Sequence, residues 1–184
     1  LYYDRKAPRG QVAVLEEKTR ITTAQGEGDL ASGYFLDLEI AQSTIGERSV
    51  TVSPYRYSGF SIRATEAWNK SNSTILTSEG MDRDAANFTH ARWVLVLGET
   101  DTGGEAGFLM MSHDGNRSHP EKLRTWDTQE NGEVFVNFNT VADDGWEYDP
   151  GIEYVRKYRL YIFDGVISQS QAAALWQGYV AVEN

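Results

Sequence analysis

Alternation of apolar and polar residues is the feature that most restricts the fold of this chain. The even-numbered residues of segment 34–40 are all apolar, and Asp37 and Glu39 lie between them, as expected for a half-buried strand. Similar patterns, bounded by Gly, Asn, Asp or Pro, occur in segments 11–23, 49–55, 59–67, 92–97, 107–112, 133–138 and 154–163. Eight such strands predict an all-β fold, an antiparallel β-sandwich formed as a single domain by residues 1–184.

Helical periodicity is clearest in segment 168–178 near the C-terminus. Ser168 can cap the first turn, and Gly178 can end the helix. The apolar residues that share one side of this helix are Ala172, Leu175, Trp176 and Tyr179. This spacing predicts a C-terminal helix packed on the sandwich.

Composition excludes several classes of protein. The chain has 17 Lys and Arg against 27 Asp and Glu, a net charge of −10, and no Cys. Nucleic acids and acidic membrane surfaces attract basic proteins, so neither is an expected partner. No apolar run approaches the roughly 18 residues of a membrane span, and without Cys there are no disulfides or thiolate metal sites.

Four stretches without a clear period are predicted to be loops, at residues 69–89, 98–105, 112–132 and 142–151. The third is the richest in chemistry, because His113, Asn116, Arg117 and His119 follow directly after an apolar strand and Trp126 comes shortly afterwards. A rigid strand that leads into such a loop is a common way to present a site. A simple surface turn is the alternative interpretation.

Metal binding is not the expected role of this loop. His113 and His119 lie six residues apart, which fits no short metal motif, so no metal is predicted there. Calcium remains an alternative elsewhere in the chain, since four acidic residues crowd one loop, although a solvated acidic turn is the simpler interpretation. These residues are Asp143, Asp144, Glu147 and Asp149.

Arginine and aromatic residues elsewhere suggest recognition of sugars. Arg63 lies on a predicted strand and Arg92 begins another, and each can bind hydroxyl or carboxylate groups or pair with an acid of the fold. Aromatic residues form 12% of the chain, and sugar rings stack on Trp and Tyr while polar side chains bind their hydroxyls. Filling of the sandwich core is the alternative role for most of these aromatics.

The order of segments resembles the bacterial PmoA-type "methane oxygenase" family. The similarity spans nearly the whole chain through short motifs. These are Pro8-Arg9-Gly10 with Val14-Leu15-Glu16-Glu17, Tyr57-Ser58-Gly59-Phe60-Ser61-Ile62-Arg63, Ala91-Arg92-Trp93-Val94, the run 106–120, and Tyr158-Arg159-Leu160-Tyr161-Ile162-Phe163-Asp164-Gly165. The family name cannot describe the chemistry, because a membrane copper oxygenase needs transmembrane helices and a nitrogen-rich copper site.

The resemblance implies a β-sandwich similar to the galactose mutarotase supersandwich, from bacteria that process carbohydrates. Family members carry an N-terminal His-rich segment that this sequence lacks, which implies the C-terminal part of a longer protein or a divergent short member. The family loop His-Pro-x-Asn-x-Arg-His-Pro corresponds here to residues 113–120. His113, Asn116 and His119-Pro120 match, whereas Asp114 replaces the first proline and Ser118 separates Arg117 from His119.

These observations together favour a carbohydrate-active protein that binds a saccharide on the sheet face and under loop 112–132. His113 or His119 would move protons, with Glu66 or Asp114 as the partner carboxylate, in a hydrolase-, lyase- or mutarotase-like reaction. The expected substrate-binding residues are Arg63, Arg92, Asn116, Arg117 and Trp126.

A non-catalytic carbohydrate-binding module and a protein-interaction domain are the alternatives, so the sequence leaves enzymatic activity open. A periplasmic or secreted location is expected for an acidic sandwich of bacterial carbohydrate metabolism.

Overall fold

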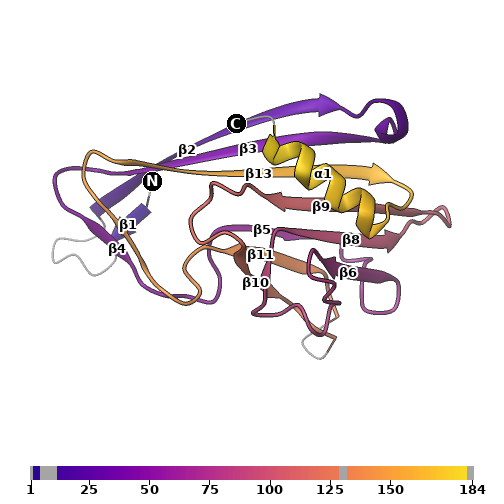
Figure 1. The fold of residues 1–184 in the computed structure, drawn as a ribbon. Helices are drawn as coiled ribbons and strands as arrows, with labels where there is room; N and C mark the ends of the chain where they lie inside the picture. Colours follow the sequence, from indigo (N-terminus) through magenta and orange to yellow (C-terminus); the bar gives the residue numbers. More distant parts are fainter. Residues whose placement is uncertain (1, 5–11, 129–131, 182–184) are drawn as a thin grey trace.

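The structure is a computed structural model that describes residues 2–4, 12–128 and 132–181 (Figure 1). The first half of the chain forms β1 (Tyr2–Asp4), β2 (Val12–Gln25), the 3-10 turn η1 (Gly28–Leu30), β3 (Gly33–Thr44), β4 (Val50–Val52), β5 (Phe60–Arg63), β6 (Ser73–Thr77) and β7 (His90–Ala91). The second half forms β8 (Trp93–Glu99), β9 (Glu105–Ser112), β10 (Glu121–Thr125), β11 (Phe135–Asn139), β12 (Trp146–Tyr148), β13 (Glu153–Asp164) and α1 (Gln169–Ala181).

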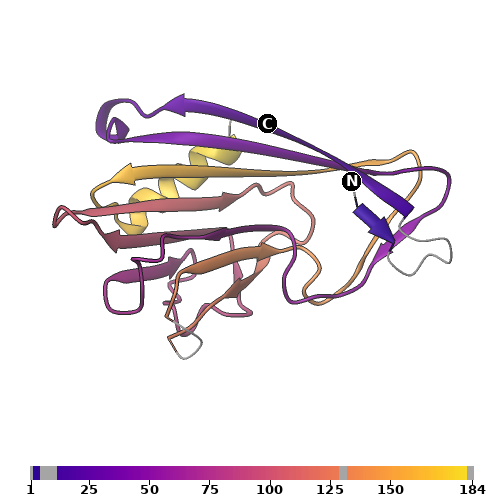
Figure 2. The same ribbon diagram turned by 180° about the vertical axis from the view of Figure 1, so that it is seen from behind.

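The strands form three antiparallel sheets. The large sheet has seven strands in the order β1-β2-β3-β13-β9-β8-β6, and the small sheet has four in the order β5-β11-β10-β7. β12 and β4 form a separate two-stranded sheet. The small sheet lies on one face of the large sheet, and α1 lies on the other (Figures 1 and 2).

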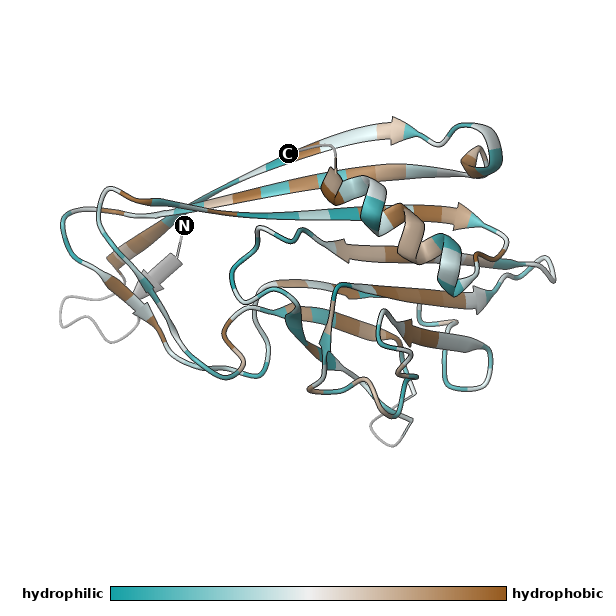
Figure 3. Ribbon diagram, viewed as in Figure 1, coloured by the Kyte–Doolittle hydropathy of each residue, from teal (hydrophilic) through white to brown (hydrophobic). Residues whose placement is uncertain are grey.

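Alternation along the central strands divides the core between these two faces. Val94, Val96 and Met110 pack toward the small sheet, whereas Leu95 and Leu109 pack toward α1. Figure 3 shows most of the apolar residues on the strands, while the connecting segments are largely polar. Burial on both faces makes β8 and β9 almost continuously apolar.

The predicted all-β class is confirmed, with antiparallel sheets and one C-terminal helix. Each of the eight predicted strand segments contains a strand; residue 11 and the motif at 8–10 lie outside the described residues. The predicted helix is also present, but it continues past Gly178 to Ala181. Gly178 lies within the helix and does not have the left-handed backbone conformation with which many helices end.

Three predicted loops are wrong in part because each contains a short strand. β6 lies within 69–89, β10 within 112–132 and β12 within 142–151. In β10, Glu121, Arg124 and Thr125 are buried together with Leu123. Polar residues buried through specific partners do not produce the alternation by which a strand is recognised in a sequence.

The inner face of the large sheet, toward the small sheet, is mainly apolar near the C-terminal end of β13. A pocket of about 580 Å³ opens there between the sheets, and its walls include Ile62, Trp68, Phe108, Leu160 and Ile162. The hydroxyl groups of a sugar would find few partners on such a surface.

Candidate functional site

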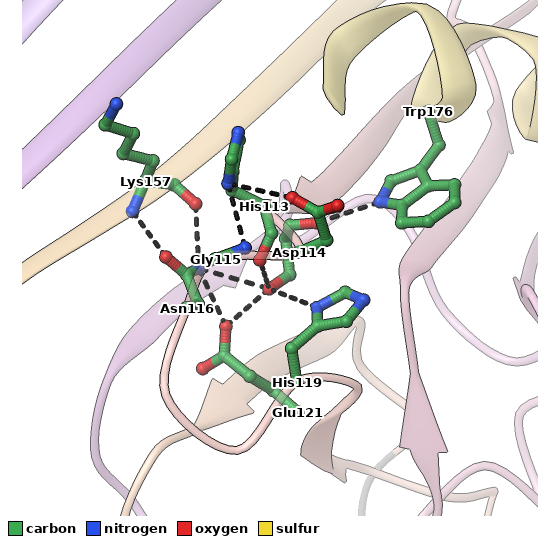
Figure 4. Close-up of polar contacts among 9 residues, drawn as sticks. His113, Asp114, Gly115, Asn116, His119, Glu121, Lys157 and Trp176 are labelled. Carbon is green, nitrogen blue, oxygen red and sulfur yellow. Dashed lines mark hydrogen bonds and ion pairs between the residues drawn. The ribbon is translucent and has the colours of Figure 1, made fainter. Parts of the chain in front are cut away.

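The candidate site is formed by the segment that joins β9 to β10, from Ser112 to Glu121. The segment turns tightly through two backbone hydrogen bonds. The N–H of Asn116 donates to the carbonyl of His113 at 3.0 Å, and the N–H of His119 donates to the backbone carbonyl of Asn116 at 3.2 Å. Ser118 has a φ of 61°, which is uncommon for a residue other than glycine. The two histidines and Asn116 are therefore held close together (Figure 4).

A buried carboxyl group lies beneath this turn. The Glu121 side chain is fully buried, and its Oε1 accepts hydrogen bonds from Ser112 Oγ at 2.5 Å and Asn116 Nδ2 at 3.1 Å. The Tyr158 hydroxyl lies 3.1 Å from its Oε2. Burial raises the pKa of Glu121 and outweighs these hydrogen bonds, which act in the opposite direction.

Asn116 fastens the turn to the large sheet. Its Oδ1 accepts from the Lys157 amide, and its Nδ2 donates to the Lys157 carbonyl, both at 2.8 Å. The side chain thus bonds to β13 much as a neighbouring strand would. Its amide is engaged within the fold, although the sequence suggested that it binds substrate.

His119 is the residue of this segment that can act as a base. It is half-buried, with Nδ1 3.4 Å from Ser112 Oγ, and its ring is parallel to the indole of Trp176 with centroids 5.8 Å apart. Trp176 is fixed by a 2.8 Å hydrogen bond from Nε1 to the Ser112 carbonyl. Burial lowers the pKa of His119, while Asp114 opposes and Arg92 and His113 reinforce this effect. The imidazole is therefore neutral at pH 7 and can accept a proton.

The remaining groups around His119 are charged. The guanidinium of Arg92 lies over the Trp176 ring at 5.3 Å and pairs with Glu79 at 3.1 Å. His113 lies 3.3 Å from the Asp114 carboxylate and accepts the Gly115 amide hydrogen bond on Nδ1. His113 also has an edge contact with Tyr179 of α1. His119, Trp176, Arg92 and Asp114 thus combine a base, an aromatic surface and both signs of charge.

The structure separates the other expected site residues from this group. Arg63 stacks on Trp126 at 4.4 Å on the outer face of the small sheet, where it pairs with Glu133. Arg117 stacks on Trp146 of β12 at 4.7 Å. Glu66 is exposed in the segment that follows β5, so Asp114, rather than Glu66, is the carboxylate beside the histidines.

Sequence reasoning missed the buried half of the site. Glu121 lies in a segment predicted to be a loop, where a glutamate is expected to be exposed to solvent. No pattern in the neighbouring sequence indicates that it is buried. Trp176 was expected to pack on the sandwich, with a binding role as the less favoured alternative, and it both packs there and borders His119. The helical period could identify its side of the helix but not the loop that it meets.

No group of three or more His, Asp or Glu in the described part of the chain has metal-binding geometry. Among the acidic residues considered for calcium, Asp143 pairs with Lys122 and Asp149 accepts from Ser49 Oγ. These two carboxylates are thus engaged by other side chains.

Comparison with protein families gives one result. Residues 4–177 match the family of unknown function DUF6807. The chain belongs to this family. Neither the curated proteins nor the solved structures contain a match to it. None of the helices in the described ranges is long and apolar enough to cross a membrane.

Proposed function

We propose that this member of DUF6807 binds a saccharide at the surface formed by His119, Trp176, Arg92 and Asp114, and that His119 acts there as a base. The observation that carries the proposal is the neutral, half-buried imidazole fixed beside an indole ring. The resemblance to the PmoA-type family, and through it to galactose mutarotase-like sandwiches, supports a sugar as the ligand.

The arrangement favours proton transfer over hydrolysis by paired carboxylates. Glycosidases generally use two carboxyl groups on opposite sides of the scissile bond. Here Glu121 is sealed and hydrogen-bonded, which leaves Asp114 as the accessible acid beside His119. A base beside one carboxylate suits abstraction of a proton from a sugar carbon or hydroxyl, as in a lyase, epimerase or mutarotase.

The site can be tested by calorimetry with neutral mono- and oligosaccharides. We expect a saturable signal that weakens about tenfold in Trp176→Phe, because the smaller ring stacks less well on a sugar. Trp126→Phe is the matched control on the small sheet and should bind normally. If no neutral saccharide binds, or if both variants weaken equally, the proposed site is wrong.

The role of His119 as a base has a separate test. For any saccharide that binds, NMR in D₂O should detect exchange of a carbon-bound sugar proton or faster interconversion of the anomers. His119→Gln should slow this process about 100-fold or more while binding persists. The rate should fall as the pH drops through the lowered pKa of His119, since protonation removes the base. A rate of exchange or of anomer interconversion that is unchanged in His119→Gln contradicts the proposal.

A non-catalytic carbohydrate-binding module is the second candidate, and a different surface favours it. Arg63 over Trp126, with Phe135 beside the indole at 5.0 Å, forms an aromatic patch on the outer face of the small sheet. In that case Trp126→Phe would weaken saccharide binding, Trp176→Phe would not, and no proton exchange would occur.

A further inference from the structure

Arg117 and Arg156 lie against the same aromatic ring, the indole of Trp146. Their Cζ atoms are 4.7 Å and 5.5 Å from the ring centroid. Arg117 comes from the segment between β9 and β10, Arg156 from β13 and Trp146 from β12. Arg156 and Trp146 are each only 5% exposed. Two positive charges are thus placed together in a largely buried part of an acidic protein.

Hydrogen bonding within the fold leaves both guanidinium groups incompletely matched. Arg156 Nη1 donates to Thr140 Oγ1 at a long 3.4 Å, and its buried Nε has no hydrogen-bond partner. Arg117 Nη2 donates to the Gly145 carbonyl at 3.1 Å, and its buried Nη1 has no partner. Neither arginine forms an ion pair with an Asp or Glu in the described ranges.

Other arginines of the chain show how fully this fold can satisfy such groups. Arg83 is 6% exposed and donates to two atoms of Ser73 and to the carbonyls of Gly132 and Glu133. Arg159 binds Asp37 through two nitrogens, at 2.5 Å and 2.7 Å. Because an unmatched buried donor is costly, and a charged one more so, Arg117 and Arg156 together call for an anion.

The neighbouring acids are bonded to other partners. The carboxyl of Glu121 accepts from Ser112, Asn116 and Tyr158, and burial raises its pKa while the charge of Arg156 acts in the opposite direction. Glu17 accepts from Gln42 Nε2 at 2.7 Å, and Gln42 accepts from the Tyr148 hydroxyl at 2.6 Å. The hydroxyl of Tyr148 lies in the field of both arginines and stays protonated because burial raises its pKa.

We propose that Arg117 and Arg156, with Trp146 between β13 and the β9–β10 segment, form an oxyanion site that takes the carboxylate of a small organic acid. A guanidinium presents its N–H groups in a planar fork that matches a carboxylate, and two such groups can bind one from two directions. The same N–H groups can also bind phosphate, so the test must compare a carboxylate with phosphate. The site is separate from the surface at His119, which faces α1 through Trp176, and it does not depend on saccharide binding there.

The test measures thermal stability and calorimetric binding with D-glucuronate, inorganic phosphate and D-glucose, with ionic strength held constant by NaCl. Glucuronate should raise the melting temperature saturably and by more than glucose, because glucose lacks the carboxylate and can bind only at the surface near His119. Arg117→Gln, at a partly exposed position, should weaken glucuronate binding about tenfold or more. Arg63→Gln makes the same change in charge on the small sheet and should bind like the unmodified chain, as should His119→Gln.

Three results would overturn the proposal. Glucuronate that acts no more strongly than glucose would show that no oxyanion site exists, and equal losses in Arg117→Gln and Arg63→Gln would show only a general effect of charge. Binding of phosphate without glucuronate would contradict the carboxylate assignment. Arg156→Lys gives an independent check, because it keeps the charge but loses the planar fork and should also weaken glucuronate binding.

Discussion

At the scale of single residues, Glu121 links the chemistry of the site to its stability. Ser112 Oγ and Asn116 Nδ2 both donate to one carboxyl oxygen, and the Tyr158 hydroxyl meets the other. All three groups donate to the carboxyl, since the Tyr158 hydroxyl donates to Oε2. These hydrogen bonds and the charge of Arg156 lower the pKa of Glu121, but burial disfavours the charged form more strongly and raises the pKa.

Glu121→Gln should therefore retain the fold and remove a pH dependence. The pKa of Glu121 is raised above its ordinary value of 4.5 in the folded chain, so its contribution to stability is complete below that pH. This contribution is lost as the pH rises through the folded pKa, at about 1.4 kcal/mol for each unit by which the pKa is raised. Urea unfolding at several pH values should show that the free energy of unfolding of Glu121→Gln increases relative to that of the unmodified chain as the pH increases.

The exposed Glu147 on β12 provides the control for this experiment. Glu147→Gln should keep the pH dependence of the unmodified chain. If the free energy of unfolding of Glu121→Gln changed with pH in the same way as that of the unmodified chain, Glu121 would ionise without cost in the folded state. Glutamine suits the test because it is uncharged and keeps an oxygen that accepts from Ser112 and Asn116.

At the scale of elements, close contact between strands fixes where side chains are tolerated. Gly107 of β9 pairs with Leu97 of β8 and Phe163 of β13. A Cβ added at Gly107 would lie 2.4 Å from the Val96 carbonyl oxygen, which is backbone and cannot turn aside. In contrast, a Cβ on Gly178 of α1 would meet nothing within 4 Å.

Two glycine-to-alanine variants should therefore have opposite effects. Gly107→Ala should destabilise the chain by about 1–3 kcal/mol because the strands must separate. Gly178→Ala should stabilise it by about 0.5–1 kcal/mol because alanine restricts the unfolded chain and favours helix. Thermal unfolding of both variants measures this. Stabilisation by Gly107→Ala would mean that β8, β9 and β13 lie farther apart than described.

Elements also show what the sequence could predict. Long strands such as β3 and β13 were recognisable because alternate residues face a core and the other face is partly polar. β10 was not, since Arg124 is buried between the rings of Tyr57 and Phe88, and no local pattern indicates such partners. The end of α1 was predicted too early because a glycine within an otherwise favourable helix is tolerated.

At the scale of the whole molecule, residues that looked like one site in the sequence lie on different surfaces. The loop at 112–120 holds His113 and His119, which the structure brings beside Asp114, with Arg92 next to His119. Arg63 and Trp126 lie together on the outer face of the small sheet. Proximity along the chain could not show that two sheets separate Trp126 from Trp176, because the order of strands in a sandwich depends on long-range pairing.

This separation predicts that the two tryptophans act independently. Within the described residues, the two tryptophans share none of these partners. Trp126 contacts Phe135, Tyr57 and Arg63, whereas Trp176 contacts His119, Arg92 and the Ser112 carbonyl. The effects of Trp126→Phe and Trp176→Phe on the free energy of unfolding should add to within about 0.5 kcal/mol in the double variant. Urea unfolding of the three variants tests this. A larger interaction energy would mean that the two surfaces communicate through the sheets, and a ligand at one would then alter the other.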